Sequence, residues 1–424
     1  MRGFSGLLRP PRTTALLLAA GLLAPACAPT PGAGERKPPL VVITIDGLRA
    51  DAVGALGGRP GWTPRLDELA SAADWTGRAV AASGAPATAA ASLLTGLSPW
   101  QHQALPGSRP RLRPHFYTFA EACAERGYAT RVFRSGDWQR RRLGFLQGFD
   151  TDEEATDQAK ARAALRSLPG GAELVWLHLT VPAGELEVKG AARAAGWASY
   201  GAAVGAADRV LGDWLDALRQ GGRFDDALIA VAGVAGFELG EDGRVGQGGS
   251  LERSLIEVPL VVKLPAGERR RIAVRRDERV AAQRLFATLV EATGARVAPA
   301  AGPSLFRAAP AGALSELYLV RGVNRFSLVQ GDAQLERAVS FAAPPPGQQR
   351  ALPSRRLIRR FFATPPWTGD GAAPRLRLLR WTARGTEALP DPARQAALHA
   401  ALERRFFAFL ERETTADEES ARRR

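Results

Sequence analysis

The sequence predicts an α/β protein with a mostly parallel central sheet between layers of helices, followed by a smaller C-terminal part. Short apolar runs of strand length alternate with amphipathic helical patterns over roughly the first 300 residues, an order typical of layered α/β domains. The strand runs are apolar almost throughout, as expected for parallel strands buried on both faces. A chain of 424 residues is long enough to bury one large core or two modest ones.

The first predicted strand and helix open this pattern. Residues 40–45, LVVITI, form a buried strand that ends at Asp46. Residues 63–73, TPRLDELASAA, form a helix with Thr63 as N-cap and Pro64 at the first helical position, where the missing N–H of proline is tolerated. The leucines of this helix fall on one face, which is therefore expected to pack against the sheet.

The same signals continue along the chain. Further strands are expected at residues 129–134, 173–179, 227–233 and 258–264. Further helices are expected at residues 200–220 and 278–294, the second with Gly294 as its C-cap, and a last helix at 391–413. After about residue 300 the pattern loosens and a Pro-rich stretch interrupts it.

These signals divide the chain into five parts. We expect a signal peptide with a lipobox at residues 1–27, a linker at 28–38, the α/β domain at 39–300, a C-terminal subdomain at 301–413 and a disordered tail at 414–424.

The N-terminal segment has the features of a secretion signal. Arginines precede a short apolar run at residues 15–24, which is too short for a comfortable membrane span. The sequence LAPAC, ending at Cys27, resembles a bacterial lipobox, in which the cysteine is lipidated and becomes the new N-terminus. We expect an exported protein, lipid-anchored in the bacterial envelope, and Ala28 lacks the aspartate associated with inner-membrane retention. The alternative is an ordinary signal peptide that contains a cysteine.

The net charge is strongly positive, at +14, and nearly all of the basic residues are arginine. The densest runs are residues 269–276 and 354–362. They indicate either contact with acidic lipid headgroups or envelope polysaccharide, or a solvated surface face. Nucleic acid is not an expected partner, because the chain has an export signal and no recognition motif. If Cys27 is lipidated, Cys123 is the one remaining cysteine, and we expect it to serve packing.

Eight blocks of sequence resemble the sulfatases of the alkaline phosphatase superfamily, and they occur in the family's order. The blocks are VVITIDGLRADAVGALGG, TPRLDELA, SLLTGLSPWQH, LGFLQGFD, WLHLTVP, ADRVLGDWLDAL, FDDALIAV and GGSLERSLIEVPLVVKLP. The resemblance runs from about residue 39 to 310 and implies the three-layer sulfatase fold, with a mostly parallel central sheet. The C-terminal part is only loosely similar.

The resemblance also implies a demanding chemistry. In the family, a divalent cation, usually calcium, lies where several strands end and is held by carboxylates with an Asn or His. A formylglycine, made from Cys or Ser at a helix N-terminus, attacks sulfur, while nearby His, Lys and Arg bind sulfate and move protons. Alkyl side chains can fill none of these roles.

At the matched positions this chain lacks most of those groups. The nucleophile position is Pro86, and the arginine of the modification motif is replaced by Ala90. Asp46 retains the first metal carboxylate. The other matched metal and sulfate positions carry Gly47, Ala183, Val234, Ala235 and Gln247. His102 and His178 lie in family blocks, but at positions that do not bind metal or sulfate in relatives.

Three alternatives concern single residues. Thr88, close to the nucleophile position, either attacks as a threonine does in related phosphodiesterases or serves as N-cap of a helix over residues 89–94. His178 ends a strand and is either a core histidine, the interpretation we favour, or a ligand. Asp46 persists as a remnant of the metal site, as a turn or cap residue, or as a partner of Arg49.

A further alternative is a relocated cation site. Its candidate ligands are Asp51, Glu238, Glu241 and Asp242, although acidic residues beside a Gly-rich loop are more often solvated.

These observations favour a sulfatase-like envelope lipoprotein that binds a polysaccharide or protein partner without hydrolysing it and needs no cofactor. Its lipid would supply the contact with the membrane. The alternative is an active sulfuric- or phosphoric-ester hydrolase with rearranged catalytic residues, which would require calcium.

Overall fold

A computed structural model describes most of the chain after residue 36. The described residues are 37–105, 110–135, 141–154, 165–166, 172–181, 193–241, 243–298, 301–309, 312–317, 323–340, 376–382, 385–389, 391–401 and 404. They belong to one compact unit that begins at Lys37. Cys27 with the expected signal peptide, the linker up to residue 36, and the expected tail lie outside the described residues.

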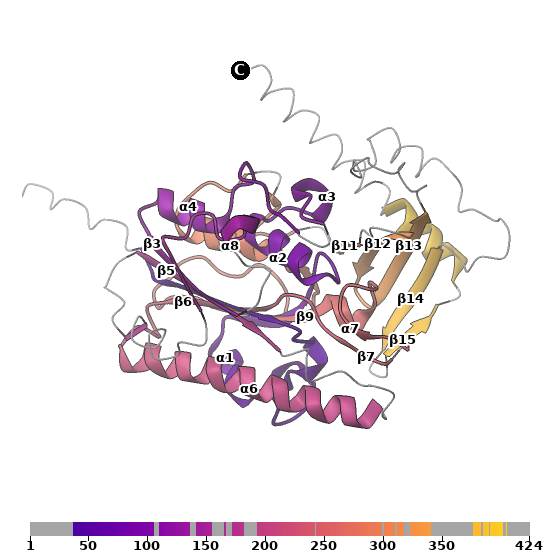
Figure 1. Cartoon of the computed structure of the whole chain (residues 1–424). Helices are drawn as coiled ribbons and strands as arrows, with labels where there is room; N and C mark the ends of the chain where they lie inside the picture. The colour runs from indigo at the N-terminus through magenta and orange to yellow at the C-terminus, as the bar shows by residue number, and fades with distance from the viewer. Residues whose placement is uncertain are drawn as a thin grey trace, which may run out of the picture. The chain divides into compact units, whose positions relative to one another are not determined.

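A central sheet runs through the larger part of the described chain (Figure 1). Its eight described strands lie in the order β10-β2-β9-β6-β1-β5-β3-β4. Their bounds are β1 (Leu40–Asp46), β2 (Trp75–Val80), β3 (Ala129–Arg134), β4 (Thr151–Glu154), β5 (Glu173–Thr180), β6 (Leu228–Gly233), β9 (Glu257–Lys263) and β10 (Val280–Ala281). Only β9 runs antiparallel to its neighbours, so the predicted mostly parallel sheet is confirmed.

Helices cover both faces of this sheet, which gives the predicted three layers (Figure 1). On one face lie α2 (Pro86–Thr95), α3 (Pro99–His102), α4 (Phe119–Glu125) and α8 (Arg284–Ala292). On the other lie α1 (Pro64–Ala72) and the long α6 (Arg193–Gln220). Successive residues of β1 point alternately into these two layers: Leu40 and Val42 belong to one apolar cluster, and Val41 and Ile43 to the other.

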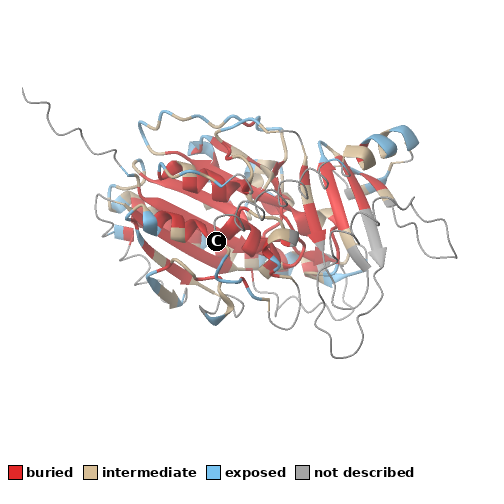
Figure 2. Cartoon of the chain, turned by 90° about the horizontal axis from the view of Figure 1, so that it is seen from above, coloured by how far each residue is buried: buried red, intermediate tan, exposed pale blue. Residues whose placement is uncertain are grey.

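Burial on both faces explains why the strand sequences are apolar throughout. All seven residues of β1 and all six of β6 are buried. Figure 2 shows the same for the strands of the central sheet and the helices packed on it. Among the described residues there is no helix with the length and hydropathy of a membrane span.

The C-terminal part forms a second, antiparallel sheet (Figure 1). Its strands, in order, are β11 (Ala313–Leu317), β12 (Val323–Gln330), β13 (Ala333–Ser340), β14 (Leu376–Thr382) and β15 (Gly385–Ala388). Ser315 Oγ donates to the carbonyl of Ala81 (2.6 Å), and Gln334 Nε2 donates to the carbonyl of Leu251 (2.8 Å). These bonds join the second sheet to segments beside the central sheet.

An arginine cluster strengthens the same junction. The carboxylate of Glu257 on β9, which is 2% exposed, binds the guanidinium groups of Arg78, Arg253 and Arg279. Arg253 and Arg279 also pack on the ring of Trp381 in β14, at 5.6 and 5.2 Å from its centroid. The charge of a buried carboxylate is thereby compensated, as burial requires.

Short elements complete the description. They are η1 (Ala50–Ala52), η2 (Gly54–Leu56), η3 (Arg141–Leu143), the hairpin of β7 (Glu238–Leu239) with β8 (Val245–Gly246), and α7 (Arg253–Ile256).

Three predicted helix bounds differ from the structure or extend beyond its described residues. The helix expected at residues 200–220 begins at Arg193, seven residues earlier. The helix expected at residues 278–294 begins only at Arg284, because Val280 and Ala281 pair with the last two residues of β2 as strand β10. Gly294, just beyond the helix, has the left-handed φ of 76° expected of a terminating glycine. Of the last expected helix, residues 392–401 are helical, and the part after residue 404 lies outside the described residues.

The N-terminus of α1 is capped by a side chain of α6 and not by its own N-cap residue. Thr63 occupies the predicted N-cap position, but its hydroxyl makes no capping bond. Instead Asp208 on α6 accepts hydrogen bonds from the backbone N–H groups of Arg65 (3.0 Å) and Leu66 (2.9 Å). Asp208 therefore satisfies the free N–H groups of the first turn and fixes α1 to α6.

We expect Asp208→Ala to lower the free energy of unfolding by about 1–2 kcal/mol, because two backbone donors lose their acceptor. Asp208→Asn keeps one carbonyl oxygen and should lose less. Urea unfolding followed by circular dichroism measures both variants. Equal stability of the alanine variant and the native chain would contradict this role.

Candidate functional site

The end of β1 carries the carboxylate that the resemblance marks as a metal ligand. Asp46 is the last residue of β1 and is 4% exposed. Its Oδ1 accepts hydrogen bonds from the backbone N–H of Gly47 (2.9 Å) and from Nε2 of Gln247 (3.0 Å). The carboxylate thus closes its own turn and binds a side chain 201 residues further along the chain.

Gln247 links three segments at this end of the sheet. Besides its bond to Asp46, Nε2 donates to the carbonyl of Gly236 (2.8 Å). Both hydrogens of the amide nitrogen therefore have acceptors, which fixes the orientation of the side chain. This is the position at which the resemblance implies a histidine. An amide donor has taken the place of an imidazole here.

The environment of Asp46 disfavours its charged form. Burial raises the pKa of this carboxyl to about 6, although the hydrogen bonds from Gln247 and Gly47 act in the opposite direction. Arg49, one of the partners considered for Asp46, binds Asp51 (2.7 Å) and Glu241 (2.5 Å) instead. Of the roles considered for Asp46, the structure therefore supports that of a turn residue.

Val234 and Ala235 contribute to this end of the sheet only through their backbone. Both are buried alkyl side chains, and Val234 belongs to the apolar cluster beneath α2. The N–H of Val234 donates to the carbonyl of Ile45 (3.1 Å), and the carbonyl of Ala235 accepts from the N–H of Gly47 (2.9 Å). The two matched metal positions thus serve the packing and the backbone of the strand ends.

Gly47 occupies a position that suits glycine. Its φ is 83°, and a Cβ placed there would lie 3.1 Å from Cβ of Val181. A second carboxylate at this position would therefore strain the backbone and crowd Val181, the residue after β5.

The start of α2 adjoins this site. Pro86, at the matched nucleophile position, is the first residue of α2, and its N-cap is Ala85. Proline fits there because it lacks an N–H and its φ is already helical, but it offers no nucleophilic atom. The N–H of Gly248, next to Gln247, donates to the carbonyl of Gly84 (2.9 Å). The same loop therefore contacts both Asp46 and the beginning of α2.

The prediction that Thr88 caps a helix over residues 89–94 is wrong. The helix begins two residues earlier, because Pro86 and the extended Ala85 already set its first turn. Thr88 is 1% exposed, and its hydroxyl donates to the carbonyl of Ala104 (2.8 Å). This hydroxyl joins α2 to the segment after α3.

Apolar side chains fill the space between α2 and the sheet. The void that remains measures about 10 Å³, about the volume one water needs, and Ala90 and Val234 are among its lining residues. The positions that would carry an arginine and an aspartate in the family are here part of the core.

The three described residues among those considered for a relocated cation site have partners within the chain. Asp51 and Glu241 both bind the guanidinium of Arg49, so a cation of the chain itself compensates them. Glu238 accepts a hydrogen bond from Ser250 Oγ (2.8 Å). Asp242 lies outside the described residues, as does Ala183.

The two histidines in family blocks are buried and neutral. Nδ1 of His102 accepts from the N–H of Ala104 (3.0 Å), so Nε2 carries the proton toward Ser92 Oγ (2.9 Å). His178 Nδ1 lies 2.7 Å from the hydroxyl of Thr44. Burial lowers the pKa of each ring to about 3. Both behave as core histidines in the described structure.

The donor set at the end of β1 does not fit a calcium ion. Calcium binds six to eight oxygens, whereas the described matched positions supply one carboxylate, one amide, two alkyl groups and a glycine. Elsewhere in the described part of the chain, too, no group of three or more His, Cys, Asp or Glu is placed to hold a metal. We therefore derive no catalytic step through a metal.

Comparison of the sequence with protein-family models and with curated proteins finds no match. Solved structures do match. A 2-O GAG sulfatase superimposes with a TM-score of 0.66 at 16% identity, covering 91% of this chain and 94% of that one. The chain has the sulfatase fold.

Two more solved structures share this fold. The phosphonate monoester hydrolase of Agrobacterium radiobacter has a TM-score of 0.63 at 15% identity, covering 89% of this chain and 96% of that one. A protein solved with its substrate, D-glucosamine-2-N,6-O-disulfate, has a TM-score of 0.54 at 14% identity, covering 71% of this chain and 88% of that one. The fold expected from the sequence resemblance is confirmed. The chemistry of the site depends on its side chains and not on the fold alone.

The sequence does not predict the roles of two residues of this site, Gln247 and Tyr200. The hydroxyl of Tyr200 donates to the carbonyl of Gly47 (2.7 Å) and accepts from the N–H of Arg49 (3.0 Å), which clamps the turn after β1. Both contacts join segments more than 150 residues apart, so no local pattern indicates them.

We expect Asp46→Asn to change stability in a pH-dependent way. The pKa of Asp46 is about 6 in the folded protein, above the ordinary value of 3.8. Protonation of Asp46 therefore stabilises the folded protein. This contribution is complete below about pH 4 and is lost as the pH rises through 6. Asparagine keeps the acceptor oxygen without the charge. The variant should match the native chain at pH 4 and exceed it at pH 8 by up to about 3 kcal/mol, measured by urea unfolding.

A metal ligand would behave in the opposite way. If Asp46→Asn destabilised the protein more at pH 8 than at pH 4, the carboxylate would have a cationic partner and this description of the site would be wrong.

Proposed function

We propose that this protein is a non-hydrolytic member of the sulfatase fold that binds a partner in the bacterial envelope. The observation that carries the proposal is the pairing of Asp46 with the amide of Gln247. In a metal-dependent hydrolase this carboxylate would bind a cation, and its neighbours would supply further oxygens. Here Val234 and Ala235 supply alkyl groups at those positions.

The residues at the start of α2 support the same proposal. Nucleophilic catalysis needs a side-chain atom that can attack and a group that activates it. Pro86 has no such atom, and the hydroxyl of Thr88 is buried and bonded to a backbone carbonyl. The fold does not need these groups to bind a partner, because the apolar clusters on either side of the sheet hold its layers together.

An acidic envelope polymer or an acidic protein surface is the kind of partner that the charge favours. The chain carries a net charge of +14, and the basic run at residues 269–276 places exposed arginines on the surface. These exposed positions are Arg269, Arg271, Arg275 and Arg276. Such a face attracts polyanions at low ionic strength.

The proposal predicts that the purified protein hydrolyses neither chromogenic sulfate esters nor phosphate esters and retains no stoichiometric divalent cation. Elemental analysis and the two assays, run beside an active sulfatase as positive control, measure this. Turnover that disappears with a chelator and in Asp46→Ala would establish the hydrolase alternative instead. Turnover that persists in Asp46→Ala would indicate a contaminating enzyme.

The envelope location is a separate part of the proposal and rests on the lipobox resemblance at Cys27. We expect Cys27→Ser to abolish labelling with a radioactive or clickable fatty acid and to release the protein from the membrane fraction. Cys123→Ala is the matched control, because Cys123 is buried in the core and should leave labelling unchanged. Membrane association that survives in Cys27→Ser would contradict a lipid anchor at this residue.

A further inference from the structure

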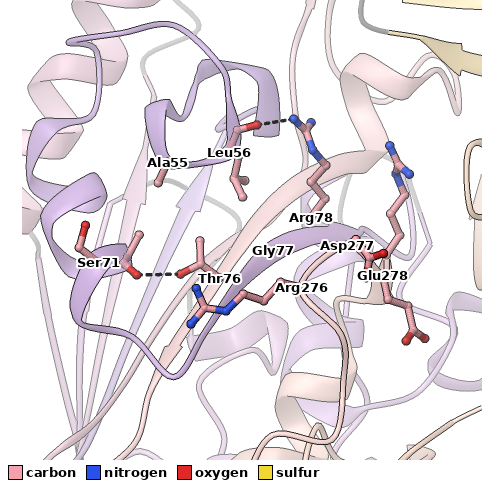
Figure 3. A pocket seen from close by; sticks show the side chains of 11 residues that line it. Ala55, Leu56, Ser71, Thr76, Gly77, Arg78, Arg276, Asp277 and Glu278 are labelled. Carbon is pink, nitrogen blue, oxygen red and sulfur yellow. Dashed lines mark hydrogen bonds between the residues drawn. The ribbon is translucent and has the colours of Figure 1, made fainter.

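A pocket of about 580 Å³ lies beside β2, at the edge of the central sheet (Figure 3). Strand β10 pairs only with Ala79 and Val80, so residues 75–78 of β2 have no neighbouring strand on this side within the described part of the chain. The edge pocket, as we call it, is lined by η2, the end of α1, β2 and the segment before β10, with Thr76, Arg78, Arg276, Asp277, Glu278 and Arg279 among its residues. Its volume is in the range of small-molecule sites. It lies three strands away from β1, so it is distinct from the site around Asp46.

Two arginines of the edge pocket are held in fixed positions. The guanidinium of Arg78 binds Glu257 (3.1 Å) and donates to the carbonyl of Leu56 (2.5 Å), a bond drawn in Figure 3. The guanidinium of Arg279 binds the other oxygen of Glu257 (2.8 Å) and donates to the carbonyl of Gly331 (2.9 Å). Because these side chains are already ordered, a ligand would lose little of its binding free energy in ordering them.

Three guanidinium groups surround the carboxylate of Glu257 at the base of this pocket, because Glu257 also binds Arg253 (2.7 Å). Asp51, which forms its ion pair with Arg49, also interacts electrostatically with Arg78 and Arg253. Burial by itself would raise the pKa of Glu257, but the three arginines hold it below its ordinary value. The carboxylate is therefore ionised at neutral pH and compensates one of three positive charges. Asp277 adds no free negative charge, because it forms an ion pair with Arg275 (2.7 Å).

Arg276 supplies the donor that is available to a ligand. It is exposed and forms no hydrogen bond or ion pair with any other residue that the structure describes. Figure 3 shows its side chain extending across the edge pocket toward Thr76, whereas the carboxylate of Glu278 points away from it. A guanidinium with all of its donors available can bind an oxyanion through two parallel hydrogen bonds.

We propose that the edge pocket binds an oxyanion, the carboxylate, sulfate or phosphate of a small acidic molecule or of an acidic polymer, with Arg276 as the contacting residue and Arg78 and Arg279 as the fixed positive charges behind it. The proposal does not depend on the loss of hydrolytic activity, because the pocket is far from the strand end that carries Asp46. The net charge of the chain favours binding of anions in general, and this proposal names the site at which they bind.

The test uses the mature full-length chain and three probes: inorganic phosphate, inorganic sulfate and oligogalacturonate. Isothermal titration calorimetry at constant ionic strength measures their binding. Arg276→Gln should weaken binding by about tenfold or more, the loss of a hydrogen bond to a charged group. The matched control is Arg271→Gln, which removes an exposed charge from the same basic run outside the pocket and should change affinity less than twofold, or about 0.4 kcal/mol.

A second variant tests the pocket by a gain of affinity. Glu278→Gln removes one of the two carboxylates from the lining and should tighten binding of the same probe. Circular dichroism spectra check that all three variants are folded, which is expected because Arg271 and Arg276 are exposed and Glu278 is partly exposed.

The outcomes separate clearly. Binding of phosphate or sulfate that depends on Arg276 identifies a small oxyanion site, and Arg276-dependent binding of oligogalacturonate alone identifies a polymer site. Equal losses in Arg276→Gln and Arg271→Gln would mean general electrostatic attraction and would overturn the proposal. Absence of binding by all three probes, or binding unchanged in Arg276→Gln, would overturn it as well.

Discussion

The hydrogen bonds that Gln247 and Gly47 donate to the buried carboxylate of Asp46 organise the strand ends where the sulfatase fold carries its chemistry. A carboxylate that is 4% exposed needs a partner, and the family supplies a metal ion at this place. Here an amide supplies one hydrogen bond to Asp46 and another to Gly236. The loop that carries Gln247 is thereby fixed to β1 by side-chain hydrogen bonds, and the same loop contacts the start of α2 through Gly248 and Gly84.

The stability of the fold rests mainly on apolar packing and not on the hydrogen bonds around Asp46. The two apolar clusters on either side of the central sheet contain the inward faces of α1, α2, α4, α6 and α8. Val234, at a metal position of the family, extends one of these clusters. A buried alkyl group at this position carries no charge that would need compensation and adds apolar contact to the core.

Arginine side chains form several of the ion pairs at partly buried junctions of this molecule. Glu257 forms ion pairs with Arg78, Arg253 and Arg279 at the junction of the two sheets. Arg49 forms ion pairs with Asp51 and Glu241 beside the turn after β1. A guanidinium group can bind a carboxylate, a carbonyl and an aromatic face at the same time, which suits partly buried junctions. The same property lets three arginines share the carboxylate of Glu257 beside the edge pocket.

The spacing of apolar residues predicted five of the eight described strands of the central sheet, the longer helices and the class of fold, because a local period decides which side chains share a face. The residues at the matched positions likewise determined which chemical groups the site lacks. Local patterns did not place the start of α2 at Pro86 or turn Val280 and Ala281 into a strand, since pairing with β2 decided the latter. Only the tertiary structure could assign Gln247 to Asp46 or Asp208 to the start of α1. These partners lie 201 and 142 residues apart, and the order of the strands and the packing of the layers bring them together.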